Sequence, residues 1–154
     1  MLTLKNVAPK RFVSVAIAAT SVGFLTFGCG ESKVAQCNKF TTVANKAKDF
    51  ASDSQALKNT TDPNQIADKI SQLADQLDSL NTEMKGIGFS DDKLKSFQTQ
   101  YADLVGTSAT SMRDLSSAIK SKDAAKANSS AKSLQDVGPK LINVDQELQK
   151  YCSN

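Results

Sequence analysis

Apolar residues recur at alternating steps of four and three positions within residues 63–85. This spacing places side chains on one face of an α-helix, because neighbouring turns repeat every 3.6 residues. The face consists of Ile66, Ile70, Leu73, Leu77, Leu80 and Met84. The pattern therefore predicts an amphipathic helix over residues 63–85.

The same periodicity predicts three further helices, over residues 32–58, 91–119 and 124–151. The apolar face of the first is Phe40, Val43, Ala47, Phe50 and Leu57. That of the third is Leu94, Phe97, Tyr101, Leu104, Ser108, Leu115 and Ala118. That of the fourth is Ala127, Ala131, Leu134, Leu141, Leu148 and Tyr151.

Helix-start signals precede three of these segments. Asp62 is expected to cap the second helix, with Pro63 at its first position, where a missing N–H is tolerated. Ser90 is the expected cap of the third helix, and Asp123 that of the fourth.

Gly138 and Pro139 fall inside the fourth segment. Proline has no N–H to donate, and its ring clashes with the preceding turn of a helix. We therefore expect a kink or a break near Gly138–Pro139, after which the helix resumes.

The connections between the predicted helices are only a few residues long. Short connections make consecutive helices antiparallel neighbours. The expected fold is therefore all-α, an antiparallel up-down-up-down four-helix bundle. A longer helical hairpin that dimerises is the alternative.

The N-terminal region has a different character. Residues 1–11 contain three basic residues and no acidic one, and residues 12–27 contain no charge. A basic start, a short apolar stretch and the small residues Gly28 and Gly30 are typical of a secretory signal peptide. The alternative is an uncleaved N-terminal anchor, although the stretch is shorter than the roughly 20 residues that a spanning helix needs.

The sequence "LTFGC" at residues 25–29 resembles the lipobox of bacterial lipoproteins. The family places leucine three residues before the cysteine and a small residue two before it, whereas this chain has Thr26 and Phe27 there. The resemblance implies a signal peptide over residues 1–28, lipidation of Cys29, and a mature domain over 29–154. Ordinary cleavage near Gly28 or Gly30, leaving a secreted soluble protein, is the alternative.

This resemblance implies a protein of the bacterial cell envelope, anchored to a membrane by its N-terminal lipid and facing the extracytoplasmic space. Such compartments are oxidising and permit disulfides. An antiparallel bundle brings the start of the first helix and the end of the fourth to the same end, with Cys37 on one and Cys152 on the other. We therefore expect a Cys37–Cys152 disulfide; two unpaired thiols are the alternative.

The formal charge of +3 does not indicate a nucleic-acid partner. Lys5, Lys10 and Arg11 account for the whole surplus, so the chain from Cys29 onward is formally neutral. Nucleic-acid binders need a surplus of cations to displace counterions from the phosphates. We therefore expect no nucleic-acid partner.

The chain contains no histidine, so the commonest general base and metal ligand is absent. Four carboxylates of the second helix lie on its polar side and are interpreted as a solvated face: Asp68, Asp75, Asp78 and Glu83. Met84 and Met112 fit the apolar faces better than axial ligation of a haem. We expect no catalytic residue, no cofactor and no metal site.

These observations favour a membrane-tethered, non-catalytic binding or accessory subunit whose protein partner the sequence does not identify. The bundle is loosely similar to small lipidated helical bundles such as the PsbQ-like lumenal proteins. An envelope-structural lipoprotein and a periplasmic small-ligand sensor or carrier are the alternatives, and an enzyme is the least favoured.

Overall fold

The computed structural model describes residues 31–55 and 60–153. They form the helices α1 (Lys33–Gln55), α2 (Pro63–Gly86), α3 (Asp92–Ser121) and α4 (Ala124–Ser153), and these described residues contain no strand. The predicted all-α four-helix bundle is confirmed. The helix limits agree with the predicted ones within about two residues, except that predicted positions 56–58 lie outside the described residues.

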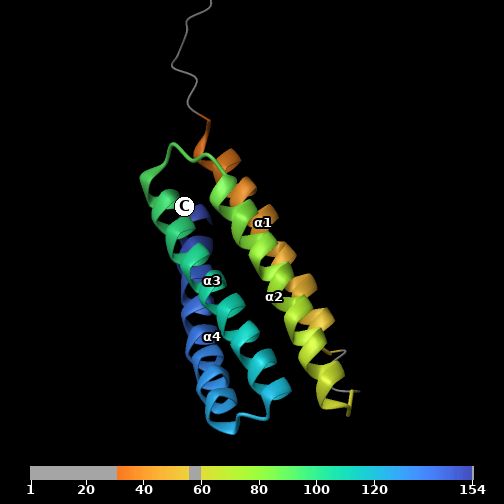
Figure 1. The fold of residues 1–154 in the computed structure, drawn as a ribbon. Helices are drawn as coiled ribbons and strands as arrows, with labels where there is room; N and C mark the ends of the chain where they lie inside the picture. Colours follow the sequence, from red (N-terminus) through yellow and green to blue (C-terminus); the bar gives the residue numbers. More distant parts are fainter. Residues whose placement is uncertain (1–30, 56–59, 154) are drawn as a thin grey trace, which may run out of the picture.

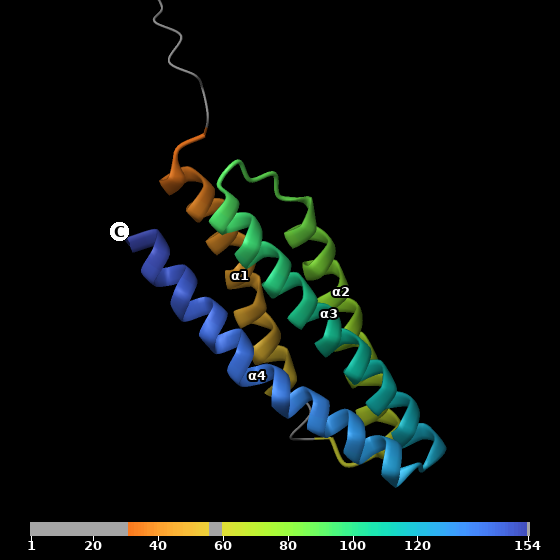
Figure 2. The same ribbon diagram turned by 90° about the vertical axis from the view of Figure 1, so that its left-hand side faces the viewer.

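The four helices run lengthwise beside one another and alternate in direction (Figures 1 and 2). The packing is uneven: α3 lies mainly between α2 and α4, while α1 packs mostly on α2. The start of α1, the connection between α2 and α3 and the end of α4 lie together (Figure 1). We call this the disulfide end, after the bond between Cys37 and Cys152.

The helix starts follow the expected chemistry with one correction. The Asp62 carboxylate accepts a hydrogen bond from the Asn64 amide at 2.8 Å, as a cap does. At α3 the cap is Asp91, which accepts from the Leu94 amide at 2.9 Å, and the predicted cap Ser90 is wrong. Ser90 bonds instead to Gln36 of α1. The Ser90 amide donates to Gln36 Oε1, and the Ser90 hydroxyl accepts from Gln36 Nε2.

Helix α4 continues through Pro139, so the predicted alternative of a break is wrong. The residue before a proline normally avoids the helical region because its Cβ meets the proline ring, and Gly138 has no Cβ. The missing N–H of Pro139 frees the carbonyl of Gln135, and both residues are exposed, so water can bond to that carbonyl.

The core is concentrated toward the disulfide end. Its largest fully buried side chains are Phe40, Met84, Leu94 and Phe97. The ring of Phe40 lies 5.8 Å from that of Tyr101 in an edge-to-face arrangement, a favourable geometry for aromatic rings. Met84 is thus a core residue, as predicted.

The buried face of α4 differs from the predicted one. Its buried residues are Ser130, Val137, Val144 and Leu148. Of the predicted face only Leu148 is buried, and the others are partly exposed: Ala127, Ala131, Leu134, Leu141 and Tyr151. The buried stripe is therefore shifted relative to the expected one, and Leu141 lies at its edge, where it packs against the core and also lines the space next to α1.

Candidate functional site

Helices α1 and α4 are joined covalently at the disulfide end. Cys37 and Cys152 form a disulfide with their Cα atoms 5.9 Å apart and a sequence separation of 115 residues. This is the pairing that the cysteine count and the topology favoured. Cys29, the expected lipidation site, lies outside the described residues.

A buried amide next to this bond fixes the start of α1 to the α2–α3 connection. Gln36 is only 2% exposed, and its Nε2 donates to the Glu31 carbonyl and the Ser90 hydroxyl, both at 2.8 Å. Its Oε1 accepts from the amides of Ser90 at 2.8 Å and Asp91 at 3.0 Å. Every donor and acceptor of the amide group is therefore used.

The end of α4 is attached to the same connection by a second hydrogen bond. The Tyr151 hydroxyl donates to Asp91 Oδ2 at 2.7 Å. This bond, followed by the Leu94 amide, lowers the pKa of the Asp91 carboxyl below its ordinary value. The same bond raises the pKa of Tyr151, because it stabilises the protonated phenol.

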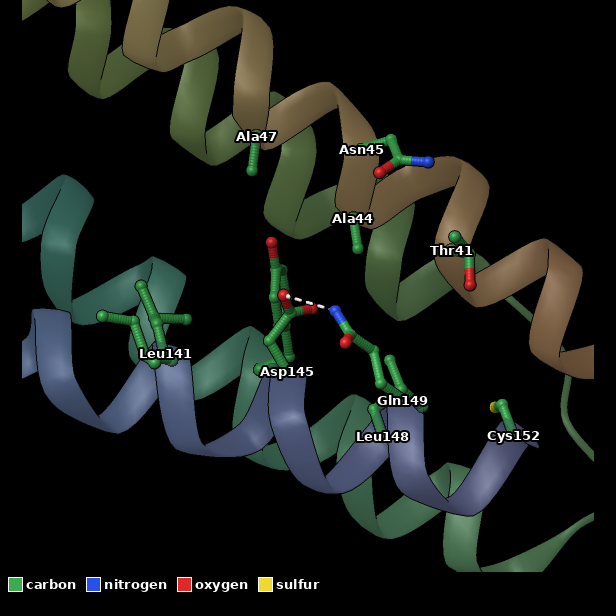
Figure 3. A pocket seen from close by; sticks show the side chains of 11 residues that line it. Thr41, Ala44, Asn45, Ala47, Leu141, Asp145, Leu148, Gln149 and Cys152 are labelled. Carbon is green, nitrogen blue, oxygen red and sulfur yellow. Dashed lines mark hydrogen bonds between the residues drawn. The ribbon is translucent and has the colours of Figure 1, made fainter. Parts of the chain in front are cut away.

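Beyond the disulfide, α1 and α4 separate and leave a groove of about 360 Å³ between them (Figure 3). We call it the α1–α4 groove. Its α1 wall is formed by Thr41, Ala44, Asn45 and Ala47. Its α4 wall is formed by Leu141, Ile142, Asp145, Leu148, Gln149 and Cys152, and Tyr101 of α3 completes the lining.

A second cavity of about 290 Å³ continues the groove away from the disulfide end. The two share Ala47, Tyr101 and Leu141. The inner cavity is mostly apolar and also contacts Met112 and Leu134. Together they form an elongated space whose α1 side includes Ala44 and Ala47 in the groove and Phe50 in the inner cavity.

Tyr101 is the most buried polar group of the groove. The residue is 6% exposed, and its hydroxyl has no hydrogen-bond partner among residues 31–55 and 60–153. Burial, followed by the nearby Asp145 carboxylate, raises the pKa of Tyr101 to about 12. At neutral pH the phenol is therefore uncharged and keeps its proton.

Asp145 is the only carboxylate among the lining residues that the structure describes. Within the described chain its carboxylate accepts a hydrogen bond from Gln149 of the same helix, whose Nε2 donates to Oδ2 at 3.4 Å (Figure 3). The carboxylate and the Gln149 amide both point into the space between the helices, facing Ala44 and Asn45 of α1 (Figure 3). A single negative charge thus lies within an otherwise uncharged lining.

The carboxylates that the sequence placed on a solvated face form ion pairs across helices. Asp75 accepts from Arg113 of α3 at 2.8 Å, and Asp78 pairs with the same guanidinium. Asp68 pairs with Lys120, and Glu83 pairs with Lys46. All four lie away from the α1–α4 groove.

The described part of the chain has neither a cluster of metal-binding side chains nor a membrane-spanning helix. No group of three or more Cys, Asp or Glu side chains there is placed to hold a metal ion. None of the helices α1 to α4 combines the length and the apolarity needed to cross a bilayer. Met112 is partly buried and packs against the core.

Sequence reasoning missed Asp145 and Gln149 as candidate site residues. A signal was present, because Leu141 and Leu148 are one heptad apart and Asp145 occupies the intermediate position of the same stripe. A lone carboxylate inside an apolar stripe indicates a special environment. Tyr101 was assigned to the core, which is correct for its ring but not for its hydroxyl.

Comparisons with known proteins gave no match: no family model, curated protein or solved structure is similar to this chain.

Proposed function

We propose that this chain is a bacterial lipoprotein that acts as a non-catalytic binding subunit on the extracytoplasmic side of a membrane. In this proposal residues 1–28 are removed, Cys29 carries the lipid, and the α1–α4 groove binds the partner or ligand. The groove is the observation that carries the binding role. It is concave, mostly apolar, and holds a few convergent polar groups, as binding sites commonly do.

The chemistry of the lining supports binding rather than catalysis. A phenol whose pKa is raised to about 12 donates or accepts hydrogen bonds at neutral pH but is a poor base. The Asp145 carboxylate is paired only with an amide of its own helix, so it offers charge and acceptor atoms to a ligand. Neither group is placed next to a described nucleophile.

The proposed tether agrees with the position of the groove. Only three residues separate Cys29 from Lys33, where α1 begins at the disulfide end. A lipid on Cys29 would therefore hold this end close to the membrane surface, with Cys152 at the near end of the groove. The disulfide and the hydrogen bonds of Gln36 would keep the first turns of α1 folded when the lipid tether pulls on them.

A periplasmic carrier or sensor of small ligands is the second candidate. Its support is the size of the groove, since cavities of about 300 to 1,000 Å³ suit small molecules. This candidate has the same proposed cellular location and the same binding groove as the first. The two differ only in the molecule that the groove binds.

The proposed membrane location is tested in cells that make the chain at its native level. The mass of the mature N-terminal peptide is measured, and the cells are fractionated. We expect a diacylated Cys29 in the membrane fraction, and a Cys29→Ser variant that is no longer membrane-bound in mature form. A soluble chain that starts at or after Gly30 would overturn the lipid tether.

The binding role is tested separately with a photo-reactive residue in place of Ile142, which lines the groove and is 59% exposed. The control carries the same group at Gln72, an exposed position of α2 outside the groove. Cross-linked products that are specific to position 142 in intact cells are the expected result. Equal labelling from both positions would argue against a binding role for the groove.

A further inference from the structure

We propose that the α1–α4 groove binds a small apolar cation, namely a molecule with an ammonium group on an aryl or alkyl body. The proposal rests on the binding role of the groove proposed above, but it does not depend on the lipid tether. It identifies the chemical class of the occupant from three independent features of the lining.

The first feature is the unpartnered hydroxyl of Tyr101. The side chain is 94% buried, lines both the groove and its inner continuation, and finds no hydrogen-bond partner in the described chain. The hydroxyl itself is accessible from the groove, because Asn81 Oδ1 is the one fully enclosed side-chain atom without a partner in the described chain. A ligand in the groove can therefore reach the phenol oxygen and bond to it.

The second feature is the sign of the charge. Asp145 lies close enough to Tyr101 to contribute to the raised pKa of the phenol, and no described cation lines the groove. An anion in this position would be repelled, and a neutral ligand would leave the carboxylate without a counter-charge. An ammonium group has three donors, so it can bond to Asp145 and to the Tyr101 oxygen simultaneously.

The third feature is the apolar wall around these two groups. Ala44 and Ala47 leave room on the α1 side, while Leu141 and Leu148 present branched side chains on the α4 side. Ile142 of the same wall is 59% exposed and extends the apolar surface at the edge of the groove. An aryl or alkyl body would cover these surfaces while its ammonium group meets Asp145.

The test uses three probes that share one body and differ in charge: 4-phenylbutylamine, 4-phenylbutanol and 4-phenylbutyrate. Calorimetric titration is performed on the full disulfide-bonded chain as isolated, in phosphatidylcholine nanodiscs if it is membrane-bound, with empty nanodiscs subtracted. We expect the amine to bind at least about tenfold more tightly than the alcohol or the acid.

Variants assign this preference to the proposed groups. Asp145→Asn should reduce the preference for the amine to less than about threefold, whereas Asp136→Asn should leave it unchanged. Asp136 is the matched control because it is exposed, lies on α4 and does not line the groove. Tyr101→Phe should weaken the amine and the alcohol about three- to tenfold, and Ala44→Leu should abolish binding of all probes by filling the groove.

Lys48→Gln tests whether the chain itself supplies a cation to the groove, because Lys48 follows Ala44 by about one helical turn in the sequence of α1. Amine affinity within about twofold of the parent supports the proposal. A rise of about tenfold or more would overturn it for the natural chain, because Asp145 would then be compensated internally.

Equal affinity for the three probes, or no binding at millimolar concentration, would also overturn the inference. Specific cross-linking of a protein from position 142 without amine binding would show that the occupant is a protein segment. In that case the small-cation inference fails and the proposed binding role stands. Failure of both experiments would reject the binding role as well.

Discussion

Two of the contacts between neighbouring helices, the α2–α3 seam and the α1–α4 seam, differ in how closely the helices approach each other. At the α2–α3 seam, the Ser116 hydroxyl donates to the Ala67 carbonyl at 2.7 Å, and a Cβ on Gly106 would lie only 3.0 Å from the Asn81 side chain. The α1–α4 seam is closed by one disulfide and then opens into a groove. Contact stabilises the first seam, and a covalent bond spans the second.

This contrast has a physical reason. Close helix packing needs small residues or interlocking side chains along the whole seam. A groove needs walls that are held apart, and a cross-link near one end keeps two helices together without filling the space between them. The disulfide thus holds α1 and α4 together while the groove between them stays open.

Removal of the disulfide is expected to have the largest effect. In the chain-entropy model a cross-link over 115 residues contributes about 4 to 5 kcal/mol to the free energy of unfolding. The Cys37→Ser/Cys152→Ser double variant should lose about 3 to 5 kcal/mol in denaturant unfolding. Hydrogen exchange should show lower protection in α1 than in α2 and α3.

Reductant provides the control for this experiment, because it should destabilise the parent and leave the double variant unchanged. A uniform loss of protection over all four helices would contradict the view that the disulfide acts chiefly on the α1–α4 seam.

Replacement of Pro139 is expected to act in the opposite direction. A proline inside a helix costs about 3 kcal/mol because a hydrogen bond is lost and the ring crowds the preceding turn. Pro139 is exposed within an unbroken helix, so Pro139→Ala should raise the free energy of unfolding by about 1 to 3 kcal/mol. Lys140→Ala is the control, with an expected change below about 0.5 kcal/mol.

Thermal and denaturant unfolding of both variants measure this difference. A Pro139→Ala variant that is less stable than the parent would mean that the proline shapes α4 in a way that the fold requires.

A smaller effect is expected at the α2–α3 seam. Ser116→Ala removes the buried hydrogen bond to the Ala67 carbonyl and should lower the free energy of unfolding by about 1 kcal/mol. Ser117→Ala, on the exposed side of the same helix, should change it by less than about 0.5 kcal/mol. Equal effects in chemical denaturation would show that the seam does not depend on this contact.

The smallest effect concerns the hydrogen bond between Tyr151 and Asp91. The lowered pKa of Asp91 stabilises the fold above its ordinary value of 3.8, and this contribution is lost as the pH falls through the lower folded value. The raised pKa of Tyr151 stabilises the fold below 10.0, and that contribution is lost as the pH rises through the higher folded value.

The Tm difference between the parent and Tyr151→Phe should therefore be largest between about pH 5 and pH 9 and should narrow toward both extremes. Tyr101→Phe is the natural control, because the chain has only two tyrosines and Tyr101 does not bond to Asp91. With that variant the difference should not narrow at acid pH. A Tyr151→Phe difference that stays constant from pH 2 to pH 7 would exclude the proposed linkage.

The sequence predicted the fold and the ends of the helices well, because α2 and α3 have strong apolar stripes with clear start signals. It predicted α4 less well. Its apolar stripe is broad, and Val137 and Val144 at its centre are buried whereas Leu141 at its edge is shared between the core and the groove. Periodicity alone does not show which positions of a broad stripe lie at its buried centre.

The groove itself could not be read from the sequence. It depends on the distance between α1 and α4, which is a property of how the whole bundle packs. Gln36 was missed for a similar reason, because its partner Ser90 is 54 residues away in the sequence. The lipidation of Cys29 stays a prediction.

The Cys37–Cys152 bond also has a mechanical consequence. A chain pulled between its N-terminal side and its C-terminal end carries tension through this bond rather than through the helices between the two cysteines. That sequence separation of 115 residues would otherwise extend over about 390 Å at about 3.4 Å per residue. A pulling force applied near residue 32 would thus extend only the few residues that precede Cys37. The four helices would stay folded and move as one unit.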